Sequence, residues 1–192
     1  MPPRFTRAEL ESFRGAEVPD LVGPRVRLVF VGINPGLMTA ALQIHFGNPA
    51  NRFRPALVAA GLLEPPADGV PGMSHADLAT LLSRGVGITN LVPFATARAD
   101  ELTRAQLTAG RSRLEAFVVE HRPRVVAVLG ITAYRVAFER PRARPGLQPE
   151  RIGKAALWVV PNPSGLNAHE SVASLAAAYA EPARAAGIAL GG

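Results

Sequence analysis

Two short loops rich in proline and glycine each follow an apolar run, and this arrangement constrains the fold more than any other feature. The first loop, Gly32–Gly36, comes after the largely apolar stretch 26–31, and the second, Asn162–Asn167, comes after the stretch 156–160. Runs of this length and composition predict buried strands. Open α/β sheets build their binding clefts past the carboxyl ends of such strands. We therefore expect one cleft built from both ends of the chain.

Strand and helix signals alternate along the rest of the chain. We expect strands near 25–33, 86–92, 124–130 and 156–161, and helices near 50–62, 75–83, 103–121, 131–139 and 171–186. This alternation predicts a parallel sheet in a layered α/β domain. The segments 67–74 and 140–153, rich in glycine, proline or arginine, are expected to be loops. We expect an N-terminal extension, helical or loop, at 1–24, one domain at 25–187 and a tail at 188–192.

Composition excludes several classes of protein. The chain of 192 residues is 48% hydrophobic, enough for a sizeable core. No stretch approaches the ~18 apolar residues of a membrane helix, and the N-terminus lacks a signal-peptide core, so we expect a cytoplasmic protein (nucleoid-associated in a bacterium). The absence of cysteine excludes disulfides, thiolate zinc sites and cysteine-held iron–sulfur clusters. The four histidines show no paired spacing, so we expect no metal and no cofactor.

The net charge of +6 comes almost entirely from arginine, since Lys154 is the only lysine. A basic balance favours polyanion partners, but an overall bias toward arginine, alanine, glycine and proline also accounts for it. The densest basic stretch, 135–154, can either follow DNA phosphates or form a solvated loop. Both interpretations stay open on charge alone.

Four segments taken together resemble the mismatch-specific uracil/thymine DNA glycosylases of the uracil-DNA glycosylase superfamily. They are Gly32–Gly36, Phe46–Phe53, Gly87–Val92 and Asn162–Asn167. The resemblance implies the single-domain, three-layer α/β/α fold of that superfamily, with a short, mostly parallel central sheet. It implies a monofunctional enzyme of base excision repair that excises uracil, and related pyrimidine lesions, preferentially opposite guanine. The expected partner is double-stranded DNA with a uracil mismatch, bound by a monomer with no membrane association.

The family motif Gly-Ile-Asn-Pro-Gly implies that Asn34 is the catalytic residue. Hydrolysis of an N-glycosidic bond builds positive charge on the sugar and negative charge on the departing base. An asparagine can hold the attacking water at C1′ but is a very poor base, so catalysis would depend on positioning and electrostatics. The alternative is an asparagine that binds its own backbone in a turn.

The resemblance also implies a pocket for the flipped base. Phe46 would stack on the base, unless it is a core residue, and Asn48 would read its edge. Asn90 either lines the cleft or is a satisfied buried amide. Asn51 and Arg52 order the loop or touch phosphate, and Thr39 stands where relatives carry small residues. The remaining pocket residues are Ile33, Pro35 and Gly36. The chain departs from its relatives at Pro93-Phe94, near which they often carry a basic residue.

Leu166 resembles the wedge that fills the gap left by the extruded base. Gly165 and Asn167 would then contact the orphaned opposite base, while Ser164 and His169 would contact phosphate. The alternatives are a leucine that closes a hydrophobic seam and a solvated surface histidine.

Two other functions stay open at this point. A non-catalytic binder of damaged or abasic DNA would share these loops, because weak chemistry and tight product binding look alike in sequence. An α/β hydrolase of small nucleosides or nucleotides would need no wedge, so Leu166 argues against it.

Overall fold

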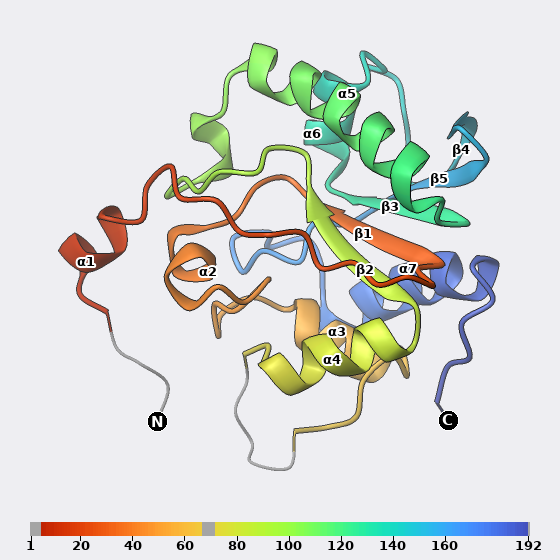
Figure 1. Ribbon diagram of the computed structural model, residues 1–192, viewed down its shortest axis with the longest axis horizontal. Helices are drawn as coiled ribbons and strands as arrows, with labels where there is room; N and C mark the ends of the chain where they lie inside the picture. The colour runs from red at the N-terminus through yellow and green to blue at the C-terminus, as the bar shows by residue number, and fades with distance from the viewer. Residues whose placement is uncertain (1–4, 67–71, 192) are drawn as a thin grey trace.

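The apolar runs form one five-stranded sheet in the order β2-β1-β3-β5-β4 (Figure 1). The computed structural model describes residues 5–66 and 72–191. The parallel strands are β1 (Leu28–Gly32), β2 (Val86–Asn90), β3 (Val125–Leu129) and β5 (Ala155–Val160). At one edge, β4 (Gly146–Ile152) pairs antiparallel with β5. The expected α/β fold with a mostly parallel central sheet is confirmed.

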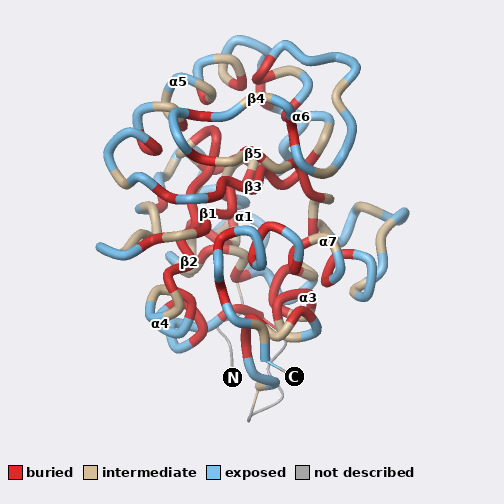
Figure 2. Tube along the Cα trace, turned by 90° about the vertical axis from the view of Figure 1, so that its right-hand side faces the viewer, coloured by how far each residue is buried: buried red, intermediate tan, exposed pale blue. Residues whose placement is uncertain are grey.

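Helices cover both faces of the sheet, and the alternation along β1 shows why. Leu28 and Phe30 belong to one core cluster, whereas Val29 and Val31 belong to the other, because successive side chains of a strand point to opposite faces. The first cluster packs under α3 (Phe53–Ala59), α4 (His75–Ser83) and α7 (Val172–Ala185), and the second under α5 (Arg104–His121) and α6 (Ile131–Ala137). Figure 2 shows the buried strands between these two exposed layers.

The five predicted helices are present, and local caps fix where they begin. Thr103 Oγ1 accepts a hydrogen bond of 3.2 Å from Gln106 N, which starts α5 one residue later. Helix α3 is shorter than predicted, because Asn51 Oδ1 accepts a bond of 2.8 Å from Phe53 N and the helix begins there. Helix α1 (Arg7–Glu11) lies in the N-terminal extension expected to be helical or loop. Two other short elements were not predicted, α2 (Leu37–Leu42) and a 3₁₀ turn, η1 (Ala99–Glu101).

The expectation of a loop over 140–153 is wrong for its second half, which forms β4. The strand alternates in burial, with Gln148 and Ile152 facing inward. The sequence did not indicate this strand, because Pro149 lacks the amide hydrogen that pairing between strands requires. An edge strand tolerates such a residue, and the pairing register shifts around it. Of the loop expected at 67–74, residues 67–71 lie outside the described part of the chain.

Part of the N-terminal segment, around Leu21, lies along the outer edge of β2. Leu21 exchanges two backbone hydrogen bonds of 2.8 Å with Ile88, and Glu17 bridges to Phe94. The segment therefore covers a strand edge that would otherwise expose unpaired backbone groups. In the described ranges, no helix has both the length and the apolar character needed to cross a bilayer. The domain boundaries expected above stay a prediction.

Candidate active site

A cleft of about 540 Å³ opens at the carboxyl ends of β1, β2 and β3. Its walls come from the loops after β1, β2 and β5 and from the segment between α2 and α3. All the residues that sequence analysis assigned to catalysis and to the base pocket line this cleft: Ile33, Asn34, Pro35, Gly36, Thr39, Phe46, Asn48 and Asn90. Ser164, Gly165 and Leu166 of the second loop line it as well. Segments far apart in the sequence thus form one cleft.

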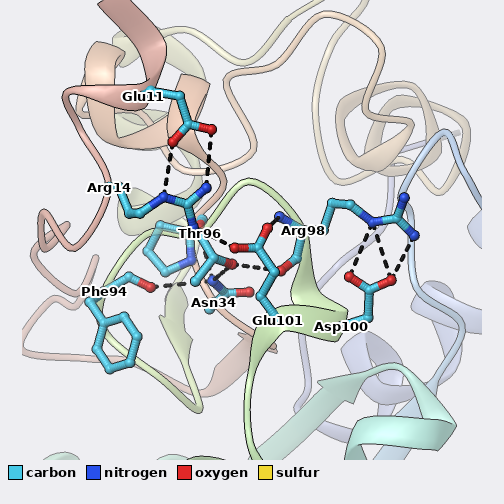
Figure 3. Close-up of polar contacts among 9 residues, drawn as sticks. Glu11, Arg14, Asn34, Phe94, Thr96, Arg98, Asp100 and Glu101 are labelled. Atoms are coloured by element: carbon cyan, nitrogen blue, oxygen red, sulfur yellow. Dashed lines mark hydrogen bonds and ion pairs between the residues drawn. The ribbon is translucent and has the colours of Figure 1, made fainter. Parts of the chain in front are cut away.

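The Asn34 side chain is held by its amide nitrogen (Figure 3). Nδ2 donates to Thr96 Oγ1 at 2.8 Å, to the backbone oxygen of Phe94 at 3.2 Å and to that of Pro35 at 3.1 Å. These acceptors fix the orientation of the amide, because only its nitrogen can donate. Oδ1 receives no hydrogen bond from any described residue. The turn interpretation accounts only for the Pro35 contact, and Oδ1 is left to accept a hydrogen bond from a water.

Thr96 belongs to this arrangement, and sequence analysis missed it. The residue is buried, and its hydroxyl donates to the backbone oxygen of Arg98 at 2.7 Å. Because its proton is used there, a lone pair of Oγ1 is left to accept from Asn34. No local pattern marks Thr96, since it lies 62 residues from Asn34 and only the folded chain brings the two together.

The backbone next to Thr96 is connected to the N-terminal helix. Arg98 N donates to Glu101 Oε1 at 2.7 Å. The other oxygen of this carboxylate binds Arg14, which also pairs with Glu11 of α1 at 2.9 Å (Figure 3). A chain of polar contacts therefore links α1 to the segment that orients Asn34.

Asn90 reaches the cleft because position 32 carries no side chain. Gly32 and Asn90 are register partners in neighbouring strands. A Cβ at Gly32 would lie 2.3 Å from Asn90 Oδ1, far inside van der Waals contact. Asn90 is only 4% exposed, and its amide makes no hydrogen bond to any described residue. The amide is not among the fully buried polar groups that lack a partner, so it opens to the cleft, where a water or a ligand can bind it. This arrangement disfavours a satisfied core amide.

Phe46 is a half-buried aromatic residue in the cleft wall. Its ring stacks on Phe53 of α3 with centroids 4.0 Å apart and an interplanar angle of 32°. Its φ of 54° is unusual for a bulky residue. The ring thus packs partly on the core, as one interpretation held, and also lines the space that a flat ligand would enter.

Three other predicted pocket residues differ in how their atoms are used. Asn48 is exposed, and its Oδ1 accepts from Ala50 N at 2.9 Å, which leaves Nδ2 and the second lone pair of Oδ1 for a ligand. Thr39 is buried on α2. Gly36 has φ −79°, and a Cβ built there would meet no protein atom within 4 Å. The protein itself therefore does not require glycine at this position.

His45 is a titratable cleft residue that sequence analysis did not assign to the site. It is 3% exposed, and its Nε2 lies 2.9 Å from the backbone oxygen of Pro19, to which it donates. Burial lowers the pKa of His45 below its usual 6.5, although the Pro19 hydrogen bond and the Asp20 carboxylate act in the opposite direction. Within 5–66 and 72–191, no group of three or more His, Asp and Glu side chains is placed to hold a metal ion.

Arg52 holds the second loop against α3. Its Nη2 donates to the backbone oxygens of Ser164 at 2.7 Å and Asn167 at 2.6 Å, and its Nη1 donates to that of Glu170. Its own backbone N–H donates to Pro163 O at 3.0 Å. Arg52 was expected to order its own loop and the helix that follows, or to touch phosphate; its side-chain contacts instead order the second loop.

Leu166 stands at the tip of the second loop and is 83% exposed. It therefore does not close a hydrophobic seam. The loop behind it packs closely, because a Cβ at Gly165 would lie 2.8 Å from the backbone oxygen of Ala50. The Asn167 amide is engaged within the loop, where Nδ2 donates to Asn162 O at 3.1 Å. The loop thus presents one large apolar side chain on an ordered backbone.

A second cleft of about 550 Å³ adjoins the first on the other side of the loop. The two clefts share Ile33, Ser164 and Leu166 among their lining residues. Asn167 and the exposed His169 line only the second cleft. The predicted site residues are therefore divided by the Leu166 loop into a base-pocket group and a smaller group beyond it.

The fold and these clefts define an α/β protein with open clefts at the carboxyl ends of its parallel strands. The family model of the uracil DNA glycosylase superfamily matches residues 19–182, so the chain belongs to this superfamily. The fold is similar to a solution NMR structure from Methanosarcina acetivorans, of a protein described as a proposed uracil DNA glycosylase. That match has a TM-score of 0.54 and 17% sequence identity, and it covers 88% of this chain and 97% of the other.

Proposed function

We propose that this protein is a monofunctional DNA glycosylase of the mismatch-specific uracil/thymine type, which excises uracil paired with guanine. Membership in the superfamily supports the uracil chemistry, and the four matching segments favour the mismatch-specific type. One observation carries the proposal. Asn34 lines the cleft with its Nδ2 held by three acceptors, so that Oδ1 is free to position a water.

The reaction needs a water and a leaving base on opposite sides of C1′. The C1′–N1 bond breaks with its electron pair moving to the base, the water oxygen bonds to C1′, and the water proton ends on the base. The products are free uracil and an abasic site. Asn34 does not ionise, so its contribution is to hold the water in line. We expect slow turnover, because a carboxylate base is not part of this arrangement.

The cleft takes the base only after it has left the stack, since the reacting atoms are unreachable inside a duplex. Phe46 supplies an aromatic wall for the flipped pyrimidine, and the unpartnered amide of Asn90 can hydrogen-bond its edge. Leu166, 83% exposed at the rim, enters the space that the base vacates. A hydrolase of free nucleosides would have no use for such a side chain.

A monofunctional enzyme uses water, whereas a bifunctional one uses an amine to form a Schiff base. Lys154, the only lysine, is exposed in the turn between β4 and β5 and lines neither cleft. We expect product strands to stay intact until alkali is added. Borohydride trapping of a protein–DNA adduct that is lost in Lys154→Ala would contradict this.

The test is a single-turnover assay on duplexes with uracil opposite guanine, uracil opposite adenine and thymine opposite guanine, and on single strands, followed by alkaline cleavage. Wild type should release uracil fastest opposite guanine. Asn34→Ala should lose roughly 10²-fold or more of the rate, the scale for a major positioning group, and should keep its DNA affinity. Binding without release by wild type would instead indicate a non-catalytic binder of damaged DNA.

A further inference from the structure

Two exposed arginines between α6 and β4, Arg142 and Arg144, make no side-chain hydrogen bond or ion pair with any residue that the structure describes. Their neighbour Arg140 is different, because its Nε lies 3.3 Å from Glu150 Oε1. The Tyr134 hydroxyl donates to the same carboxylate at 2.7 Å. The uncompensated positive charge of this segment therefore lies on Arg142 and Arg144.

The backbone that carries these two arginines is held in place. Arg135 of α6 donates to the backbone oxygen of Ala143 from Nε at 3.0 Å and from Nη2 at 2.7 Å. Gln148 of β4 donates from Nε2 to the backbone oxygens of Arg144 and Gly146, both at 2.8 Å. A cationic segment that is already ordered loses less conformational entropy when it binds a partner.

The segment also adjoins the candidate active site. Residues 140–150 surround a hollow of about 470 Å³, and Pro145 lines both this hollow and the second cleft. The second cleft in turn shares Leu166 with the base-pocket cleft. The base-pocket cleft, the second cleft and the hollow beside the two arginines are therefore successive neighbours on the surface.

We propose that Arg142 and Arg144 bind phosphates of the DNA backbone that flanks the flipped nucleotide. This inference rests on the proposed function, because it takes DNA as the ligand of the base-pocket cleft. A duplex must continue beyond that cleft, and guanidinium groups bind phosphate oxygens in a bidentate manner. Asp100 lines the second cleft, where its negative charge would repel a DNA strand. Its ion pair with Arg98 at 2.6 Å offsets most of this repulsion.

The test compares two double variants that each remove two positive charges. Arg142→Gln/Arg144→Gln removes the proposed contacts. Arg25→Gln/Arg122→Gln is the matched control. Both of its arginines are exposed and precede β1 and β3, so they lie near the amino ends of the parallel strands, away from the clefts. The probe is a duplex with a tetrahydrofuran abasic-site analogue opposite guanine, titrated over a series of salt concentrations.

Each lost phosphate contact should reduce the slope of log K against log salt by about 1. We expect a reduction of about 2 for Arg142→Gln/Arg144→Gln and little change for the control, with unaltered melting temperatures in both. Shortening the duplex on one side of the lesion should lower the DNA affinity of the wild type to that of Arg142→Gln/Arg144→Gln.

Equal slopes for wild type and both variants would overturn the inference, as would an equal loss in both variants, which would indicate a general charge effect. In either case the proposed function stands if wild type still releases uracil. Absence of both binding and release by wild type would overturn the proposed function itself.

Discussion

The guanidinium of Arg52 donates a hydrogen bond of 2.7 Å to the backbone oxygen of Ser164, which lies 112 residues further along the chain. A second bond from the same nitrogen reaches the backbone oxygen of Asn167 at 2.6 Å. Leu166 lies between these two acceptors. Arg52 therefore acts as a positioning residue that fixes the loop carrying Leu166, although it lies outside that loop.

We predict that Arg52→Lys slows uracil excision from duplex DNA by on the order of 10- to 100-fold, the scale of a small misplacement in a site. Lysine cannot reach several carbonyls with a planar fork. Excision from single strands should change much less, because no stack needs replacing there. Arg27→Lys is the control, since Arg27 also donates to two backbone oxygens but lies away from the clefts. An equal loss on both substrates would contradict a role through the loop.

Thr96→Val should slow the chemical step modestly, by about 2- to 10-fold, the value of one hydrogen bond. The loss is limited because Pro35 and Phe94 still accept from Asn34 Nδ2. Thr96→Ser should restore the rate, since a serine hydroxyl can make the same two bonds. Single-turnover rates at saturating enzyme measure this. Failure of serine to restore the rate would show that Thr96 acts by packing alone.

Leu166→Ala should lower excision most for well-paired targets and least for single strands. Unstacking a base costs a few kcal/mol, and burial of a leucine side chain offsets roughly 1.5–3 kcal/mol of that cost when complete. Because Leu166 is 83% exposed, the melting temperature should stay unchanged. A uniform loss of rate together with a lowered melting temperature would identify a core residue instead.

Asp77→Asn should destabilise the fold by about 3–5 kcal/mol, as expected when one partner of a buried ion pair is removed. Arg54 donates to this carboxylate at 2.8 and 3.0 Å, and both residues are buried. Burial would raise the pKa of Asp77, but the hydrogen bonds from Arg54 and Ser74 outweigh it and lower this pKa below 3.8.

The Asp77 contribution should therefore be present above pH 3.8 and be lost as the pH falls through the lowered pKa. Urea unfolding at several pH values measures both effects. Glu115→Gln, which breaks the exposed pair with Arg111, is the control and should cost less than about 1 kcal/mol. A similar small cost for Asp77→Asn would contradict the prediction.

His45 should make the fold less stable as the pH falls below 6.5. Its pKa is lowered in the folded state by burial, so the unfolded chain binds a proton at a higher pH than the folded chain does. Stability contributed above pH 6.5 is thus lost on acidification. His45→Gln should flatten the pH dependence of the urea midpoint in this range. An unchanged dependence would show that other groups control it.

Several parts of the fold were predictable because their causes are local. The apolar runs that end at Gly32 and Val160 predict buried strands. Thr103 predicts the start of α5, because its hydroxyl accepts a hydrogen bond from the backbone N–H of Gln106. Strand β4 was not predictable, because its proline is acceptable only at a sheet edge. That position is a property of the assembled sheet and of no local segment.

In the candidate site, too, some features follow from local sequence and others depend on contacts between distant segments. The sequence by itself determined that Asn34 and Leu166 lie in loops at strand ends, because strand periodicity and loop composition are properties of neighbouring residues. Only the tertiary structure decided which end of the Asn34 amide faces the cleft, through Thr96, and how the Leu166 loop is held, through Arg52. The physical reason is that a hydrogen bond between segments 62 or 112 residues apart depends on sheet register and loop packing. Neither leaves a signature in the order of the residues.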